Sequence, residues 1–217
     1  MEYFFLAVFV ISSVVHLYGS YINDRKIRAC SKGFILPGLL GWYCCCVPSV
    51  RGIVVAALVT SWLGDVLLIP KGTKWFTVGG VSFLASHVCF VLAYLPNVDF
   101  AAFSVWAAIA IAAVYFTAAC LVFRGLRPHL PKLLFYPMFL YLLINGTMNC
   151  FALYQLLSLP CAATVTVFLG AMLFFASDSL LFFVRFKKDT RLKSHFSVMV
   201  TYILAEFLIV LGLIMIP

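Results

Sequence analysis

Long apolar stretches alternate with short polar breaks along this chain. A membrane-spanning helix needs about 20 mostly apolar residues, each advancing the helix by about 1.5 Å. Most of the breaks contain Pro or Gly, which favour turns. The pattern therefore predicts an all-α fold, a polytopic transmembrane helical bundle of eight spans at residues 3–22, 33–50, 53–69, 75–95, 100–123, 133–157, 161–184 and 196–216.

The distribution of the basic residues indicates how these spans are oriented across the membrane. Of the 15 Lys and Arg residues, all but Arg51 fall in the first, third, fifth and seventh loops between spans. Cytoplasmic loops carry an excess of Lys and Arg. We therefore expect the odd-numbered loops in the cytoplasm and both termini on the non-cytoplasmic side.

Composition supports the same class of protein. Hydrophobic residues make up 65% of the 217 residues and charged residues 10%, against about 25% charged residues in soluble domains. We expect a single integral membrane domain over residues 1–217, without a cleaved signal peptide, because Glu2 stands where a basic flank would be. The net charge of +8 then indicates contact with anionic membrane lipid and not with nucleic acid.

Three acidic residues lie within predicted spans, where charged groups are costly and usually functional. Asp65 and Asp178 share a pattern of a small residue, Asp, any residue and Leu-Leu, and Glu206 lies in the last span. The two Asp residues lie at similar predicted depth, so they could face one cavity as an acid/base pair. The alternative is that each is a structural group with a buried partner, for which Lys32 is a candidate.

Other polar residues recur at helical spacing. Tyr141, Asn145 and Asn149 follow one another at i, i+4 and i+8, and Tyr202 lies four residues before Glu206. Such side chains either hold membrane helices together or contact substrate. The four His residues fall at different depths, so we expect no metal site and no cofactor.

Three segments resemble the YhhN-like lysoplasmalogenases, eight-span membrane proteins that hydrolyse the vinyl-ether bond of lysoplasmalogens. The segments are 61–68 (SWLGDVLL, continuing to His87), 170–181 (GAMLFFASDSLL) and 200–209 (VTYILAEFLI). Two departures stand out. The family usually has Gln where this chain has Glu206, and the Lys-Pro pair expected at the start of the second span is Lys32-Gly33 here.

The resemblance implies a lysophospholipid substrate, cleaved to a fatty aldehyde and glycerophosphocholine or glycerophosphoethanolamine. Under it, Asp65 and Asp178 are the expected catalytic pair, and the inner-face residues Lys32, Lys71 and Lys74 are candidates for holding the phosphate. Expected substrate contacts come from Lys32, Ser61, His87, Asn145, Asn149, Ser177, Tyr202 and Glu206.

Two other functions fit the same residues. Intramembrane carboxylates also serve proton relays, so a proton-coupled membrane transporter is the main alternative, and a non-catalytic lipid-binding protein is the third. The chain carries no targeting tail, which favours a bacterial inner membrane over the endoplasmic reticulum.

Overall fold

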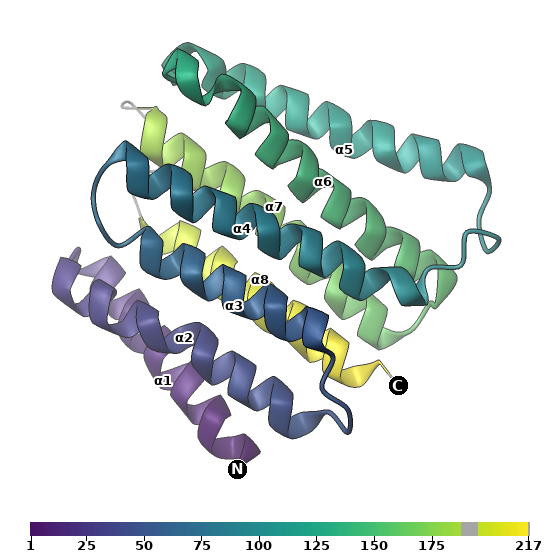
Figure 1. The fold of residues 1–217 in the computed structure, drawn as a ribbon, viewed down its shortest axis with the longest axis horizontal. Coiled ribbons are helices and arrows are strands. Elements are labelled where there is room, and N and C mark those ends of the chain that lie inside the picture. The colour runs from purple at the N-terminus through teal and green to yellow at the C-terminus, as the bar shows by residue number, and fades with distance from the viewer. Residues whose placement is uncertain (188–194, 217) are drawn as a thin grey trace. The chain divides into compact units, whose positions relative to one another are not determined.

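A computed structural model describes residues 1–187 and 195–216. These residues form eight α-helices and three short 3₁₀ turns, without a strand (Figure 1). Six helical segments among them are long and apolar enough to cross a membrane, and α3 is a shorter apolar helix. The six are Glu2–Tyr21, Thr73–Asn97, Val105–His129, Lys132–Ser158, Ala162–Phe186 and His195–Met215.

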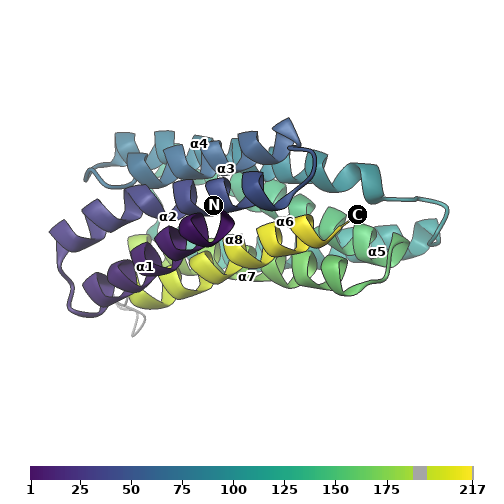
Figure 2. The ribbon, with the colours of Figure 1, turned by 90° about the horizontal axis from the view of Figure 1, so that it is seen from below.

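The chain divides into two units, Met1–Ala93 and Tyr94–Ile216, which are described separately. The first unit contains α1 (Glu2–Tyr21), α2 (Arg25–Cys46), α3 (Gly52–Leu67) and α4 (Thr73–Tyr94, up to Ala93). Helices α1 and α2 lie side by side (Figures 1 and 2). A Cβ atom on Gly38 would lie 2.7 Å from the backbone nitrogen of Phe9, so this glycine allows the two helices to approach closely.

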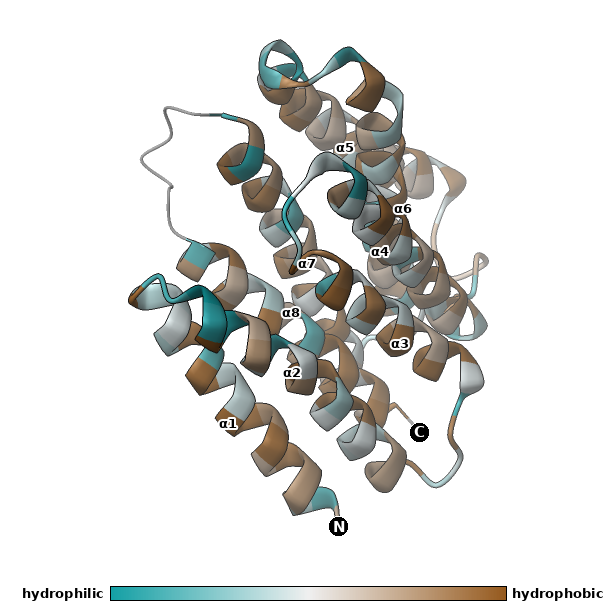
Figure 3. Cartoon of the chain, turned by 60° about the vertical axis from the view of Figure 1, so that its left-hand side comes forward, coloured by the Kyte–Doolittle hydropathy of each residue, from teal (hydrophilic) through white to brown (hydrophobic). Residues whose placement is uncertain are grey.

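Helix α2 begins earlier than the sequence pattern predicted. The predicted span started at residue 33, whereas the helix starts at Arg25. Asp24 caps it, because its Oδ1 accepts hydrogen bonds from the backbone N–H groups of Lys26 and Ile27 at 2.7 and 3.1 Å. The basic residues assigned to the first loop therefore lie on helical turns, where hydrophilic residues gather at the start of α2 (Figure 3).

Helices α3 and α4 meet through small and polar residues. The hydroxyl of Ser82 donates a 2.6 Å hydrogen bond to the carbonyl of Thr60, and a Cβ on Gly64 would lie 2.6 Å from the ring of Phe83. Small residues with interhelical hydrogen bonds are typical of helix pairs in membranes. This contact fixes the face of α3 that carries Asp65.

The second unit contains α5 (Val105–Leu126), α6 (Phe135–Ser158), α7 (Ala162–Phe186) and α8 (His195–Met215), with short 3₁₀ turns before and after α5. Helix α5 starts five residues after the predicted position 100, because Ser104 caps it through a 3.2 Å hydrogen bond from the Ala107 N–H. Helices α7 and α8 lie side by side (Figures 1 and 2). The basic residues Lys188, Arg191 and Lys193, predicted for the seventh loop, lie outside the described residues.

Candidate functional site: two buried aspartate centres

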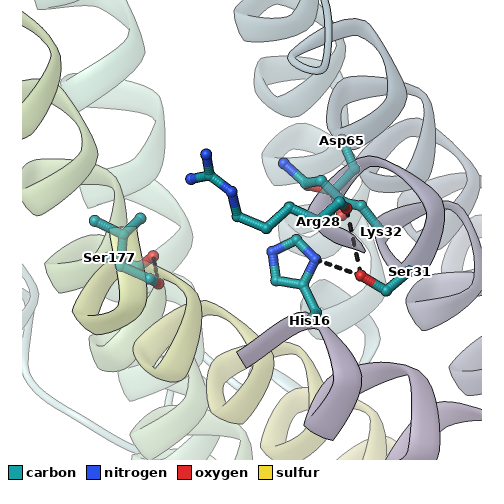
Figure 4. Close-up of polar contacts among 7 residues, drawn as sticks. His16, Arg28, Ser31, Lys32, Asp65 and Ser177 are labelled. Atoms are coloured by element: carbon teal, nitrogen blue, oxygen red, sulfur yellow. Dashed lines mark hydrogen bonds and ion pairs between the residues drawn. The ribbon is translucent and has the colours of Figure 1, made fainter. Parts of the chain in front are cut away.

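Asp65 forms the centre of a polar group in the first unit. Its side chain is 2% exposed, and its Oδ1 lies 2.9 Å from the ammonium nitrogen of Lys32, whose side chain is 14% exposed (Figure 4). The indole N–H of Trp62 donates a 3.0 Å hydrogen bond to the carbonyl of Gly33, the residue after Lys32. Helices α2 and α3 are therefore joined beside the ion pair. The structure confirms Lys32 as a partner of Asp65, as the structural alternative for this residue predicted.

His16 and Ser31 form a second contact close to this ion pair. The Ser31 hydroxyl donates its hydrogen to the carbonyl of Ile27 at 2.7 Å. The same hydroxyl lies 3.0 Å from Nδ1 of His16, within hydrogen-bond distance. This bond joins α1 to the face of α2 that carries Lys32 (Figure 4).

Ser61 lies one helical turn before Asp65 and is buried. Its hydroxyl lies 2.7 Å from the hydroxyl of Ser86 on α4, so these two groups satisfy each other. His87 follows Ser86 and is fully buried. Two of the predicted substrate contacts, Ser61 and His87, are thus internal residues of the first unit.

Asp178 forms the centre of the polar group in the second unit. Its Oδ2 accepts a 2.6 Å hydrogen bond from the Tyr141 hydroxyl and a 2.8 Å hydrogen bond from the Asn145 amide. All three side chains are buried. Tyr141 and Asn145 lie four residues apart on α6, so one face of α6 holds the carboxyl group of α7.

The polar face of α6 continues to Asn149. The Asn149 amide donates to the carbonyl and the side-chain oxygen of Asn145, at 3.0 and 3.2 Å. In residues 1–187 and 195–216, the buried Oδ1 of Asn149 accepts no hydrogen bond. An acceptor in this position can be satisfied by an ordered water molecule.

The remaining predicted residues of this unit have different surroundings. The Ser177 hydroxyl donates a 3.0 Å hydrogen bond to the carbonyl of Val198, which connects α7 to α8. The Tyr202 ring packs edge-on against Phe174, with centroids 5.6 Å apart. Glu206 is fully buried on α8. Ser177 and Tyr202 thus make contacts that stabilise the packing of α7 against α8.

The two units hold their aspartates in the same way. In each unit the Asp lies on the third long helix, and the second long helix supplies its described partners, Lys32 for Asp65 and Tyr141 with Asn145 for Asp178. These described partners differ in charge, since Lys32 is a cation and Tyr141 and Asn145 are neutral donors. Within the described part of the chain, no group of three or more His, Cys, Asp or Glu side chains could hold a metal ion.

Sequence reasoning missed part of the first centre. Arg28 was placed in a loop, and His16 was not among the predicted site residues. The signal that could have located Arg28 is the capping residue Asp24, followed by basic residues at helical spacing. Lys71 and Lys74, which were also considered for holding phosphate, are exposed.

Comparisons with known proteins support a family assignment. The YhhN family model matches residues 27–213. Proteins named "Lysoplasmalogenase" from Mycobacterium bovis and Mycobacterium tuberculosis are each 38% identical over 138 residues, which cover 61% of this chain. The matched region spans about half (49%) of the length of these relatives. No solved structure matches the chain.

Proposed function

Because the chain belongs to the YhhN family, we propose that it hydrolyses the vinyl-ether bond of lysoplasmalogens. The products are a fatty aldehyde and glycerophosphocholine or glycerophosphoethanolamine. The observation that carries the proposal is the identity to relatives named lysoplasmalogenase. The two buried carboxyl groups, Asp65 and Asp178, supply groups suited to this chemistry.

Vinyl-ether hydrolysis needs acid catalysis at carbon. A proton is transferred to the β-carbon of the double bond, which leaves an oxocarbenium ion at the carbon attached to oxygen. Water attacks that carbon and loses a proton, and the resulting hemiacetal collapses to the aldehyde and the glycerol hydroxyl. An enzyme therefore needs one group that donates a proton and one that stabilises the cation and orients water.

The two carboxyl groups are proposed to act together as an acid/base pair. Asp65 forms an ion pair with the ammonium group of Lys32, and Asp178 accepts hydrogen bonds from Tyr141 and Asn145 on one oxygen. These contacts position both carboxyl groups. In the proposed reaction one of the two donates the proton, and the other, as a carboxylate, stabilises the oxocarbenium ion.

The neighbouring polar residues are assigned to water and substrate. Asn149, with its buried acceptor oxygen, is the residue best suited to orient the attacking water. Lys32 is assigned to the phosphate of the lysophospholipid as well as to Asp65. The other proposed contacts are Ser61, His87, Asn145, Ser177, Tyr202 and Glu206, all of them buried.

The membrane arrangement is part of the proposal. Eight spans with both termini on the non-cytoplasmic side agree with the distribution of the basic residues. Helix α2 carries charges in its first two turns, and α3 has 16 residues, so these two are the spans that most need a topology test. A bacterial inner membrane is the proposed location.

Aldehyde release from a purified lysoplasmalogen tests the function. The protein is purified in non-ionic detergent and given choline and ethanolamine lysoplasmalogens with one alkenyl chain. An enzyme releases fatty aldehyde without a gradient, whereas a proton-coupled transporter releases none and moves substrate only between two compartments. Absence of aldehyde from a well-folded preparation with both substrates would reject the hydrolase and favour the transporter.

A further inference from the structure

Arg28 is a half-buried cation on the same face of α2 as Lys32. The two residues are four positions apart, so their side chains are neighbours on the helix surface. Figure 4 shows both side chains extending from one side of α2, on the side where the ring of His16 lies. Like charges at this spacing repel each other, and the carboxylate of Asp65 balances only one of the two.

Asp65 supplies only one negative charge. It forms an ion pair with Lys32 at 2.9 Å. In residues 1–187 and 195–216, no carboxylate forms an ion pair with Arg28. The guanidinium group thus stands beside an already neutralised lysine, with five N–H donors to satisfy. This is the place in the first unit where a further anion would remove an electrostatic cost.

Helix α1 holds the backbone of Arg28 in position. A Cβ atom on Gly19 would lie 2.7 Å from the Ile27 side chain and 3.3 Å from the Arg28 nitrogen, so α1 packs closely against the first turns of α2. Ser31, held by Nδ1 of His16, donates its hydrogen to the Ile27 carbonyl. The turn of helix from which the Arg28 side chain projects is therefore held in place by α1.

We propose that Arg28, together with Lys32, binds the phosphodiester group of the lysophospholipid. The inference rests on the proposed function for the identity of the substrate. Guanidinium groups match phosphate oxygens with two parallel hydrogen bonds. In this arrangement Lys32 contacts both the phosphate and Asp65, and it therefore places the head group of the substrate next to one of the two proposed catalytic carboxyl groups. Choline and ethanolamine substrates share this phosphodiester, so the proposed contact is the same for both.

Binding of a non-hydrolysable analogue tests the assignment without turnover. A saturated 1-O-alkyl-glycerophosphocholine has the phosphodiester but no vinyl ether, and 1-O-alkylglycerol lacks the phosphate. The measurement is made in non-ionic detergent and phosphate-free buffer. Arg28→Gln should weaken binding of the alkyl-glycerophosphocholine by about 10- to 100-fold, the effect of losing a charged hydrogen bond, and should not change binding of the alkylglycerol. Arg28→Lys keeps the charge but loses the paired N–H donors, so its affinity for the alkyl-glycerophosphocholine should lie between that of the parent and that of Arg28→Gln.

Lys26→Gln is the matched control, because Lys26 is exposed on another face of the same first turns. It should leave binding of both ligands unchanged.

The proposal is overturned if Arg28→Gln binds the phosphodiester as tightly as the parent does, or if this variant binds both ligands more weakly by the same factor. It is also overturned if the defect appears only in phospholipid bilayers, since the phosphate would then belong to bulk lipid. A parent protein that shows Arg28-dependent binding but releases no aldehyde would instead refute the hydrolase alone.

Discussion

The hydroxyl of Tyr141 donates a 2.6 Å hydrogen bond to Oδ2 of Asp178. The same oxygen accepts a second hydrogen bond from Asn145, and the group is buried. Two donors on one carboxyl oxygen fix its orientation. The position of this oxygen is therefore set by α6, although the carboxyl group itself belongs to α7.

Removing the Tyr141 hydroxyl should lower activity without unfolding the protein. Tyr141→Phe keeps the ring, which packs against Phe182 with centroids 5.1 Å apart. We expect kcat for aldehyde release to fall about 10- to 100-fold, the range for a hydrogen bond to a charged group, and Asp178→Asn to abolish it. Tyr136→Phe on the same helix, 87% exposed, should match the parent. Full activity of Tyr141→Phe would show that this hydrogen bond is not needed for catalysis.

The Lys32–Asp65 ion pair predicts a difference between single and double variants. Lys32→Met leaves a buried carboxyl group without its cation, which should lower the free energy of unfolding by about 3–5 kcal/mol. Lys32→Met combined with Asp65→Leu removes both charges and should recover most of that stability. Thermal unfolding in detergent measures the change.

Aldehyde release separates the structural and catalytic roles of this pair. The double variant should be folded and inactive, because it lacks one of the two proposed catalytic carboxyl groups. A stable double variant with parental activity would show that the pair is structural only. Kinetics of Asp65→Asn, Asp178→Asn and their combination add a second test, since groups that act in one step give strongly non-additive losses.

The helices were predictable from the sequence because long apolar runs are the signal that defines them. Most predicted ends agree with the structure to within two residues, as in α3, which was predicted at 53–69 and observed at Gly52–Leu67. The predicted start of α2 was wrong because hydropathy identifies the apolar part of a helix and not the full length of its hydrogen-bonded backbone. The Asp24 cap extends that helix through the charged residues from Arg25 to Lys32.

The sequence predicted the relative positions of site residues only where those residues lie on the same helix. The spacing of Tyr141, Asn145 and Asn149 correctly placed them on one face of α6. Their contact with Asp178 joins residues more than 30 positions apart, and helical periodicity carries no information about such pairing. The tight contact of Gly19 with the backbone at Arg28 was unpredictable for the same reason. The joint action of Asp65 and Asp178 stays a prediction.

Close packing of α7 against α8 makes Gly170 intolerant of a side chain. A Cβ atom there would lie 2.8 Å from the Ala205 carbonyl oxygen and from the Ile209 nitrogen. Backbone atoms cannot relieve such a clash by changing a side-chain rotamer. Gly170→Ala should therefore destabilise the protein by about 1–3 kcal/mol. Gly146→Ala is the control, because its nearest neighbour, Tyr115, would be 3.6 Å away, and it should stabilise helix α6 by about 0.5–1 kcal/mol. Equal unfolding temperatures for the two variants would contradict this packing.

Cys161 offers a direct test of the proposed topology. It caps the start of α7, at the end of this helix assigned to the non-cytoplasmic side, whereas the exposed Cys30 lies near the end of α2 assigned to the cytoplasm. In single-cysteine variants of intact cells, a membrane-impermeant maleimide should label Cys161 at once. It should label Cys30 only after the membrane is permeabilised. The reverse order would invert the orientation, and labelling of both would require a different number of spans.

The rate of that labelling should also depend on Thr164. Hydrogen bonding with the backbone N–H and the side chain of Thr164 lowers the pKa of the Cys161 thiol, so more of the reactive thiolate is present near neutral pH. Thr164→Val keeps the backbone donor and loses the hydroxyl. The pH midpoint of the labelling rate should therefore rise in this variant, and at neutral pH the reaction should be slower than with Thr164 present. An unchanged midpoint would show that the hydroxyl does not act on the thiol, while the sidedness of labelling would still report the topology.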